Sequence, residues 1–314
     1  MPDREEIVTL TLNPALDQVC WVDEIEEEVK IRAHGSSFEP GGGGINVARA
    51  LHQLDVDTTA YWSQGAETGH MMGRLLDQEG VDHHPVDIEA TTRVNLAVFA
   101  DHNGDRELMF NMPGAPLTAD EVDRWLHVVD GIDARFAVLS GSRPPDSGHI
   151  YGQITRQLTR RSKVILDTSG PGLEQALEEG VFLAKPNREE LIALAGRDAA
   201  TPSGLEAAAR DLIETGMAEI VVVSLAGEGA LAVTDGGSVR VDAPVVEAKS
   251  NVGAGDSMVA GLTRKLSGGF QVEEAVRYGV AAGADAARRP GTELCTRDGV
   301  RELLAGTTLH RSLP

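Results

Sequence analysis

One carboxylate, that of Asp256, ends a run of very small residues in the stretch NVGAGDSM, residues 251–258. Gly253, Ala254 and Gly255 leave the backbone bare, and the sequence after them has a helical pattern. Backbone N–H groups at a helix N-terminus bind anions, because they lack partners within the helix and the helix dipole favours negative charge. A bound anion repels an acidic side chain, so Asp256 needs another task there. We predict that it removes a proton.

A second glycine-rich stretch, EPGGGGINVARAL, covers residues 39–51. Its successive glycines, which include Gly42 and Gly43, suit close approach of a ligand to the backbone, although glycine-rich loops are often merely flexible. The helix that follows is expected to begin at about Ile45, with Asn46 in its first turn as a donor for a sugar hydroxyl. A dinucleotide-binding motif is disfavoured, because the run does not directly follow the first strand and no acidic residue for a ribose ends a following strand.

Two further motifs place oxygen atoms at strand ends. Asp17 in TLNPALD follows a first strand and a proline turn, which predicts a place at the rim of a ligand crevice; capping of the turn is the alternative. In KPNREEL, Asn187 and Glu190 are three residues apart at a helix start, so both can face a hydrated Mg²⁺ ion. The alternative is a capping box, in which each side chain accepts a backbone N–H of the other residue.

The stretch VVVSLAGEGAL, residues 221–231, offers a candidate nucleotide site. Ser224, Gly227 and Gly229 can line a pocket there. A tight hairpin explains the glycines equally well.

Short apolar runs alternate with helical patterns along most of the chain. This alternation predicts βαβ units, and therefore an α/β fold with a mostly parallel sheet and helices on both faces. The polar residues that end the strands should converge on one crevice, because ligands bind outside the carboxyl ends of parallel strands. The runs that predict strands are residues 7–13, 58–65, 136–141, 162–170, 181–187 and 219–233, and those that predict helices include 45–54 and 70–80.

Two segments, at about 18–37 and about 92–111, interrupt the alternation. Each resembles a pair of antiparallel strands, and HNGD in the second is a hairpin turn signal. Together they are expected to form one small sheet, as a lid over the crevice or as an oligomer interface. The basic residues Lys30, Arg32 and Arg93 fall in these segments, which indicates an anionic substrate; solvated, salt-bridged strands are the alternative.

The chain of 314 residues is long enough for one large α/β domain, residues 1–314, with the small sheet as its lid. Its net charge of −21 argues strongly against binding to nucleic-acid backbones or anionic membranes, which require Lys and Arg. A carboxylate-rich surface suits the cytoplasm of a salt-loving host, and simple solubility is the alternative. Lysines are scarce, at Lys30, Lys163, Lys185, Lys249 and Lys265.

Neither a signal peptide nor a membrane span is expected. The N-terminus lacks a basic region followed by a long apolar run, and no stretch approaches the roughly 20 apolar residues of a span. Cys20 and Cys295 are too few and too far apart for a disulfide framework or a metal knuckle. We therefore expect a soluble, cytoplasmic protein.

The ordered motifs TLNPALD, GGGGINVAR, LSGSRPP, VILDTSG, KPNREEL, VSLAGEGA and NVGAGDSM resemble the PfkB (ribokinase-like) carbohydrate kinases over nearly the whole chain. The GAGD element is highly specific to that family. Within it, FEPGGGGINVARA, KIR, TRVNL, MPGA and GTELC are similar to the minor, PfkB-type 6-phosphofructokinase branch. The branch of 1-phosphofructokinases and tagatose-6-phosphate kinases usually has GGKGIN, and Gly43 stands at the place of that lysine.

The resemblance implies a Rossmann-like, ribokinase-like core, a β-sheet lid that joins a homodimer, and the use of ATP and Mg²⁺. Asp256 would be the base, and the backbone amides of residues 253–256 would hold the transferring phosphoryl group. The residues implied for the sugar are Asp17, Gly42, Gly43, Asn46 and Ser140, and those for its phosphate are Arg93 and Lys30, which can reach across the dimer. Those implied for ATP are Lys185, Asn187, Ser224, Gly227 and Gly229, with Glu190 linked to Mg²⁺.

Family members often bind K⁺ beside the GAGD loop, which here implies Ser250, Val252 and Gly291 as K⁺ residues. Asn251 stands where this branch usually has threonine, and it lies between the implied K⁺ residues Ser250 and Val252. The activity implied is phosphorylation of the 1-hydroxyl of fructose 6-phosphate. The alternatives are fructose 1-phosphate, tagatose 6-phosphate or an unphosphorylated sugar as the acceptor, or a non-catalytic sensor of sugar or nucleotide; a nicotinamide dehydrogenase is disfavoured by the misplaced glycine loop.

Overall fold

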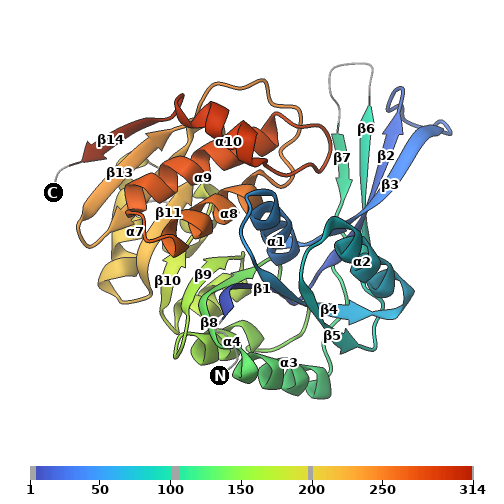
Figure 1. The fold of residues 1–314 in the computed structure, drawn as a ribbon, viewed down its shortest axis with the longest axis horizontal. Helices are drawn as coiled ribbons and strands as arrows, with labels where there is room; N and C mark the ends of the chain where they lie inside the picture. The colour runs from blue at the N-terminus through green and yellow to red at the C-terminus, as the bar shows by residue number, and fades with distance from the viewer. Residues whose placement is uncertain (1–4, 101–106, 197–200, 313–314) are drawn as a thin grey trace.

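The core of the protein is a large β-sheet with helices on both sides (Figure 1). The computed structural model describes residues 5–100, 107–196 and 201–312. The strands of the large sheet are β1 (Glu5–Thr11), β4 (Thr59–Gly65), β5 (His83–Ile88), β8 (Ala134–Ser140), β9 (Lys163–Asp167), β10 (Val181–Ala184), β11 (Ala218–Ser224), β12 (Ala230–Thr234), β13 (Gly237–Asp242) and β14 (Thr308–Ser312). They lie in the order β14-β13-β12-β11-β10-β9-β8-β1-β4-β5.

From β5 through β4, β1, β8, β9 and β10 to β11, neighbouring strands are parallel. Strands β12, β13 and β14 continue the sheet in antiparallel pairs. Parallel strands are covered on both faces and need continuous apolar runs, and Val221, Val222 and Val223 of β11 are all fully buried. The prediction of a mostly parallel α/β sheet is therefore confirmed.

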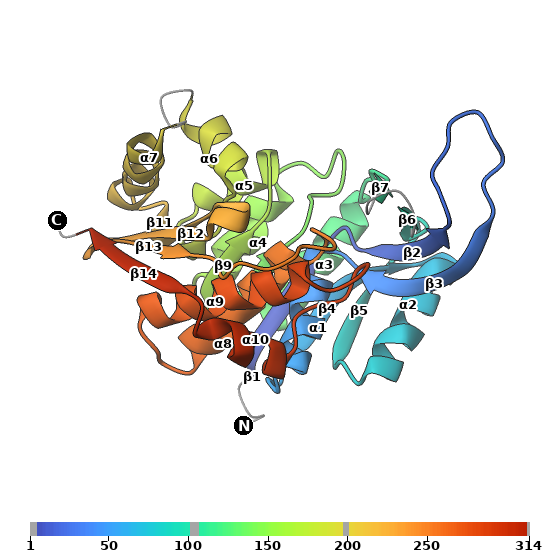
Figure 2. The same ribbon diagram turned by 90° about the horizontal axis from the view of Figure 1, so that it is seen from above.

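Two apolar clusters fill the two faces of the sheet. One contains Trp125 and Leu205, and the other contains Val47 and Val259. The helices are α1 (Gly43–Gln53), α2 (Ala66–Glu79), α3 (Ala119–Gly131), α4 (Ile150–Leu158), α5 (Pro171–Leu177), α6 (Arg188–Ala195), α7 (Pro202–Glu214), α8 (Ala254–Ser267), α9 (Val272–Ala287) and α10 (Arg297–Leu304), with a 3₁₀ turn η2 (Ala226–Glu228). Figure 2 shows α5 to α7 and α8 to α10 on opposite sides of the sheet. Among the described residues, none of the helices has the length and apolar character to cross a membrane.

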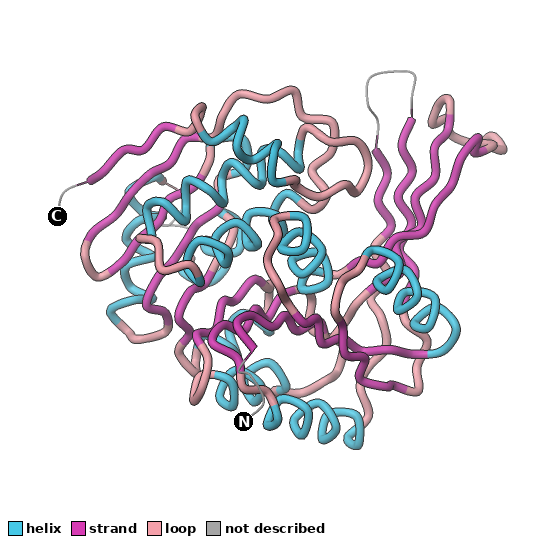
Figure 3. The backbone as a smooth tube through the Cα atoms, viewed as in Figure 1, coloured by secondary structure: helices cyan, strands magenta, loops and turns pink. Residues whose placement is uncertain are grey.

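A second, four-stranded sheet stands apart from the large one (Figure 3). Its strands are β2 (Ala15–Val22), β3 (Ala33–Gly41), β6 (Arg93–Ala100) and β7 (Glu107–Phe110), in the order β3-β2-β6-β7. The pairs β2–β3 and β6–β7 are antiparallel, and β2 runs parallel to β6. The prediction of a small sheet from these two segments is thus confirmed, and we call it the lid sheet.

The first strand pair is longer than predicted at both ends. It starts at Ala15 and continues to Gly41, whereas the prediction covered about 18–37. Asp17 therefore lies on a strand, where Asp17 and Glu39 are paired across β2 and β3, and not in a turn. Proline and glycine at the two ends masked this extension in the sequence. The predicted HNGD turn, residues 102–105, lies outside the described residues.

Candidate active site

The N-terminus of α8 is built to leave backbone amides free. Gly253 caps the helix with φ of 72°, in the left-handed region that favours glycine, and a Cβ added there would be 2.6 Å from Leu294 Cδ2. The N–H of Ser257 makes the first helical hydrogen bond, to the carbonyl of Gly253 over 2.8 Å. The amides of residues 254–256 precede that bond and have no acceptor within the helix. This helix end can receive an anion.

Asp256 lies in the first turn of α8, half-buried. Its Oδ2 accepts a hydrogen bond of 2.8 Å from Nδ2 of Asn46, in the first turn of α1. Burial raises the pKa of Asp256 to about 7, with the charge of Asp167 adding to the rise, while Asn46 and Lys185 oppose it. A carboxylate with such a pKa can accept a proton efficiently near neutral pH.

A buried ion pair lies beside Asp256. Nζ of Lys185 is 2.9 Å from Oδ1 of Asp167, at the ends of the neighbouring strands β10 and β9. Burial by itself lowers the pKa of Lys185, but the adjacent carboxylate of Asp167 outweighs it and the pKa is raised. Sequence reasoning did not single out Asp167, although its place at the end of the buried run VILD was the available signal.

Helix α1 starts at Gly43, two residues earlier than expected, and packs tightly against β8. A Cβ on Gly43 would be 2.4 Å from Oγ of Ser140 and 2.6 Å from the backbone N of Gly141. Oγ of Ser140 in turn donates to Oδ2 of Asp167 over 3.4 Å. These groups and Asp256 line a pocket of about 170 Å³, with Gly141, Ser142, Thr168, Ser169 and Glu190 as its other walls. The strand ends thus converge on one crevice.

Asp17 reaches toward this crevice from the lid sheet. Its Oδ1 accepts a hydrogen bond of 2.8 Å from Nδ2 of Asn95 on β6. Burial raises the pKa of Asp17, although this bond and the charges of Arg93 and Arg49 oppose the rise. A Cβ on Gly41 would come within 2.0 Å of Asp17 Oδ2. The sequence did not identify Asn95 as a site residue, because a polar residue in a predicted strand reads as solvent-facing.

Arg93 begins β6 and holds the neighbouring loops together. Its guanidinium donates to the carbonyls of Pro14 at 3.2 Å and Asn13 at 2.9 Å, to that of Met112, and to Oγ of Ser142 at 3.3 Å. Burial lowers its pKa, and the charge of Asp17 opposes that effect. Lys30 is not brought to this cluster: it lies exposed in the loop between β2 and β3.

The capping box predicted as the alternative for KPNREEL is present. Glu190 N–H donates to Oδ1 of Asn187 over 2.8 Å, and Asn187 N–H donates to Oε2 of Glu190 over 2.8 Å. The Glu190 carboxyl also lines the pocket that contains Asp256, and burial raises its pKa. Glu190 therefore both caps α6 and faces the crevice, whereas Asn187 caps α6 and is not among the walls of that pocket.

A larger, mostly apolar cavity of about 570 Å³ adjoins the other side of the α8 N-terminus. Gly227 and Gly229 line it together with Ala254 and Gly255, whereas Ser224 is not among its walls. Strands β11 and β12 also form the tight antiparallel hairpin expected as the alternative. The remaining walls are Ala226, Ala243, Pro244, Val245, Val246, Ala248, Asn251, Met258, Val280, Gly283, Ala284 and Ala287. Sequence reasoning missed the segment 243–248, because apolar residues in a connection carry no signal for a ligand.

The residues proposed for K⁺ lie in two loops next to α8. The backbone N–H groups of Lys249 and Ser250 both donate to the carbonyl of Ala287, and Oγ of Ser250 accepts from the N–H of Val252 over 3.1 Å. Gly291, with φ of 64°, lies in the loop that follows α9.

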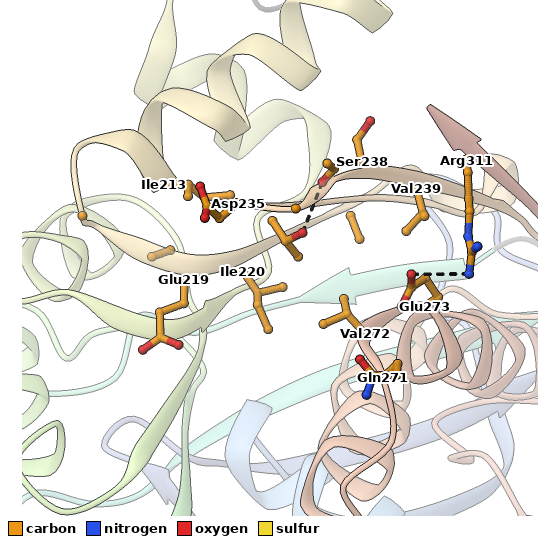
Figure 4. Close-up of a pocket in the computed structure, with 16 residues that line it drawn as sticks. Ile213, Glu219, Ile220, Asp235, Ser238, Val239, Gln271, Val272, Glu273 and Arg311 are labelled. Carbon is orange, nitrogen blue, oxygen red and sulfur yellow. Dashed lines mark hydrogen bonds and ion pairs between the residues drawn. The ribbon is translucent and has the colours of Figure 1, made fainter. Parts of the chain in front are cut away.

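A cavity of about 850 Å³ lies elsewhere and contains none of these groups (Figure 4). Residues of α7, of strands β11 to β13 and of the start of α9 line it, and Arg311 of β14 pairs with Glu273 at 3.6 Å. It includes Ala218 and Glu219, at the amino end of β11, whereas the crevice lies at the carboxyl ends of the parallel strands. The volume of a cavity therefore does not identify the active site in this structure.

Comparison with known proteins gives the family. Residues 10–298 match the family model described as pfkB family carbohydrate kinase. The ATP-dependent 6-phosphofructokinase isozyme 2 of Mycobacterium tuberculosis is 42% identical, over 95% of this chain and 88% of the relative. The isozyme of the same name from Escherichia coli is 40% identical, over 95% of this chain and 98% of the relative. A 1-phosphofructokinase from Haloferax volcanii is 33% identical, over 92% and 93% respectively.

Solved structures agree in fold. Phosphofructokinase-2 from Escherichia coli in complex with potassium superposes with a TM-score of 0.92 at 40% identity, and the match covers 96% of this chain and 98% of that one. The same protein in complex with fructose 6-phosphate gives 0.89 at 39% identity, with the same coverage. Its tetrameric inhibited form gives 0.90 at 39% identity, again over 96% and 98%. The chain therefore belongs to the pfkB family of carbohydrate kinases.

Proposed function

We propose that this kinase transfers the γ-phosphoryl group of ATP to the 1-hydroxyl of fructose 6-phosphate and produces fructose 1,6-bisphosphate. One observation carries the proposal: the first turn of α8 separates two cavities of different character. Asp256 faces the small polar pocket, which suits a sugar, while Ala254 and Gly255 face the larger apolar cavity, which suits a nucleotide base. A phosphoryl group that passes between the two ligands would pass over the free amides of this helix.

The chemistry follows from that arrangement. The sugar hydroxyl gives its proton to the Asp256 carboxylate, its oxygen forms a bond to the γ-phosphorus, and the bond from that phosphorus to the β-phosphate oxygen breaks, which releases ADP. Phosphoryl transfer depends chiefly on positioning and on charge stabilisation. The amides of residues 254–256 and the ammonium of Lys185 would stabilise the transferring charge, because both lie beside Asp256. Of the other nucleotide residues, Asn187 and Ser224 are joined by an isolated β-bridge near the crevice.

The residues around Asp256 suit Mg²⁺, an ion that prefers oxygen ligands and keeps several waters. Glu190 and Asp167 supply carboxylate oxygens to the same pocket, and their charge is only partly offset by Lys185. Glu190 would hold the ion through water. Bound Mg²⁺ neutralises phosphate charge. We propose K⁺ binding by the loops of Ser250, Val252 and Gly291, on the basis of the potassium complex of the Escherichia coli relative.

A phosphorylated sugar is the substrate class that the crevice favours. Asp17, Asn46 and Ser140 provide hydroxyl partners around Asp256, beside the glycines Gly42 and Gly43. Arg93 adds a positive charge whose guanidinium bonds go to neutral carbonyl and hydroxyl oxygens, and the nearby charge of Asp17 offsets it in part. Fructose 1-phosphate and tagatose 6-phosphate present the same charge and remain the nearest alternatives, the first supported by the 1-phosphofructokinase relative.

We also propose a homodimer formed through the lid sheet, in which Lys30 reaches the sugar phosphate of the second copy. Large apolar side chains are exposed on this sheet and its connections, and they favour burial against another surface. They are Val29, Ile31, Phe38, Leu108, Met109, Phe110 and Met112. Light scattering at assay concentration and salt tests this, because a monomer would contradict it. Higher assembly, as in the tetrameric Escherichia coli relative, is the other outcome.

The charge of the protein leads us to infer work in the cytoplasm of a salt-loving host. The excess negative charges, −21 in total, repel one another. Salt screens repulsion between charges that are farther apart than the Debye length, which is about 8–10 Å at 0.1–0.15 M and shorter at higher concentration. Melting temperature and activity should therefore rise as KCl is increased toward molar concentration. A melting temperature that is independent of KCl would leave solubility as the explanation of the acidity.

The proposed substrate is tested by ADP release with Mg-ATP in high KCl. The acceptors to compare by kcat/KM are fructose 6-phosphate, fructose 1-phosphate, tagatose 6-phosphate, fructose and ribose. Fructose 6-phosphate should lead, and Arg93→Lys should lower its kcat/KM by about tenfold or more, and by a larger factor than the kcat/KM for fructose. A higher kcat/KM for another sugar phosphate would make that compound the substrate in place of fructose 6-phosphate. ATP-dependent melting shifts without ADP release for any sugar would point to a sensor.

A further inference from the structure

The lid sheet is tied through one of its edge strands to a loop that packs against α8. On edge strand β3, Oε2 of Glu39 accepts a hydrogen bond of 2.6 Å from Oγ1 of Thr292, in the loop between α9 and α10. Thr292 is buried, with 7% of its surface exposed.

Glu39 is coupled directly to the sugar side of the crevice. It is the cross-strand partner of Asp17 in the pairing of β2 with β3. Its carboxylate also lies 3.7 Å from Arg49 of α1, the helix whose Asn46 bonds Asp256. Arg49 donates further to the carbonyl of Pro40, beside Glu39 in the chain. A displacement of Glu39 would therefore move the strand that carries Asp17.

Thr292 is connected, through the residues that follow it, to the first turn of α8, where the phosphoryl group is proposed to bind. Two residues further on, the Leu294 side chain packs against Gly253, where an added Cβ would be 2.6 Å from it. The N–H of Cys295 donates to Oγ of Ser257 over 3.2 Å. Gly253 and Ser257 enclose the turn of α8 that contains Asp256. The segment 292–295 thus spans the distance from the lid sheet to the anion-binding end of the helix.

We propose that Glu39 and Thr292 are positioning residues, whose hydrogen bond fixes the strand of Asp17 relative to the α8 turn of Asp256. Neither residue touches the reacting atoms. Phosphoryl transfer requires the acceptor hydroxyl, the base and the anion site to be aligned, and a misplacement of about 1 Å can lower the rate by 10²-fold. The role in catalysis rests on the proposed kinase function, whereas the mechanical link does not.

The mechanical link is tested by amide hydrogen exchange on the ligand-free protein. Thr292→Val replaces the hydroxyl with a methyl group of similar size and leaves Glu39 paired with Arg49, so the protein should still fold. It should speed exchange of the hydrogen-bonded amides of Ser257, Cys295 and Thr296, and Thr292→Ser should restore the wild-type pattern. Thr307→Val is the matched control, because Thr307 is equally buried at 6% exposed and its hydroxyl bonds Leu304 and Arg277 instead. Unchanged exchange in Thr292→Val would overturn the proposal.

The catalytic consequence is tested on the same variants with the preferred sugar phosphate. Thr292→Val should lower kcat/KM for the sugar phosphate by about tenfold or more, while the Kd of ATP in the absence of sugar stays within about twofold. In a double-mutant cycle, Thr292→Val added to Glu39→Ala should cost little more than Glu39→Ala alone, because the change at Glu39 already removes the acceptor of the Thr292 hydroxyl.

The results of these experiments distinguish the mechanical link from its role in catalysis. Altered exchange with undiminished kcat/KM in Thr292→Val would overturn the positioning role, and additive losses in the cycle would do the same. A wild-type protein that phosphorylates no sugar would refute the proposed function, and the exchange comparison would still decide the link between the lid sheet and α8.

Discussion

Nδ2 of Asn46 donates a hydrogen bond of 2.8 Å to Oδ2 of Asp256, although the two residues are 210 positions apart in the chain. The bond joins the first turns of α1 and α8, and so the glycine loop to the anion-binding helix. It orients the carboxylate and stabilises its charged form. The proton acceptor of the proposed reaction therefore depends on a residue from the other half of the fold.

Asn46→Ala should move the acid limb of the pH–rate profile to higher pH. Loss of this bond to a charged group raises the pKa of Asp256 further, by about one unit if the bond contributes about 1.5 kcal/mol. The profile of kcat/KM reports the free enzyme and is the measurement to make. An unshifted limb with a normal fold would mean that Asn46 acts on the sugar alone.

Asp256 should make activity rise with pH and stability fall with pH. The proposed base must be ionised, so kcat/KM increases up to a plateau above about pH 7. The folded-state pKa of about 7 exceeds the ordinary 3.8, so the folded protein holds this proton more tightly than the unfolded chain does. The stability from Asp256 is complete below about pH 4 and is lost as pH rises toward 7. Asp256→Asn should therefore raise the melting temperature at pH 8 by a few degrees, and a decrease would contradict the assignment.

Lys185→Met should damage both folding and catalysis. It leaves the carboxylate of Asp167 without its partner at 2.9 Å, which costs about 3–5 kcal/mol for a buried pair. It also removes a charge that lowers the pKa of Asp256. The double variant with Asp167→Asn should recover part of the stability in urea denaturation without recovering turnover. Full recovery of turnover would show that Lys185 has only a structural role.

Gly41→Ala should weaken sugar binding with little effect on nucleotide binding. The new Cβ would lie 2.0 Å from Oδ2 of Asp17, so that carboxylate must move away from Asn95. KM for the sugar phosphate should rise by about tenfold or more, as for loss of a charged hydrogen bond. Gly131→Ala is the control, because nothing lies within 4 Å of a Cβ there. Equal KM values in the two variants would place Asp17 outside the sugar site.

Those parts of the fold that have a local sequence signal could be predicted. The β-branched run of β11 and the apolar pattern of α2 indicate their elements directly, and the small glycine-rich run before α8 indicates an anion-binding helix end. Strand β3 shows the limit. Its continuation through Pro40 to Gly41 is stabilised by pairing with β2, which the sequence does not display.

Among the residues of the candidate site, some were likewise predicted from the sequence and others were missed. Asp256 and Asn46 were predicted from the chemistry of their motifs, and the structure places them in contact. Asp167 and Asn95 were missed, because their importance comes from partners distant in sequence, Lys185 and Asp17. Lys30 was predicted from its positive charge, but it lies exposed in the loop between β2 and β3 and is not brought to the crevice within one chain.

Turnover of the Asp256→Asn variant with Mg-ATP and fructose 6-phosphate tests the central claim most directly. Asp298→Asn is the matched control, since Asp298 is also in the first turn of a helix but is exposed. We predict that kcat falls by about 10²- to 10⁴-fold in Asp256→Asn alone, as for loss of a general base, while ATP binding persists. Wild-type turnover in Asp256→Asn would remove this carboxylate from the reaction and contradict the account.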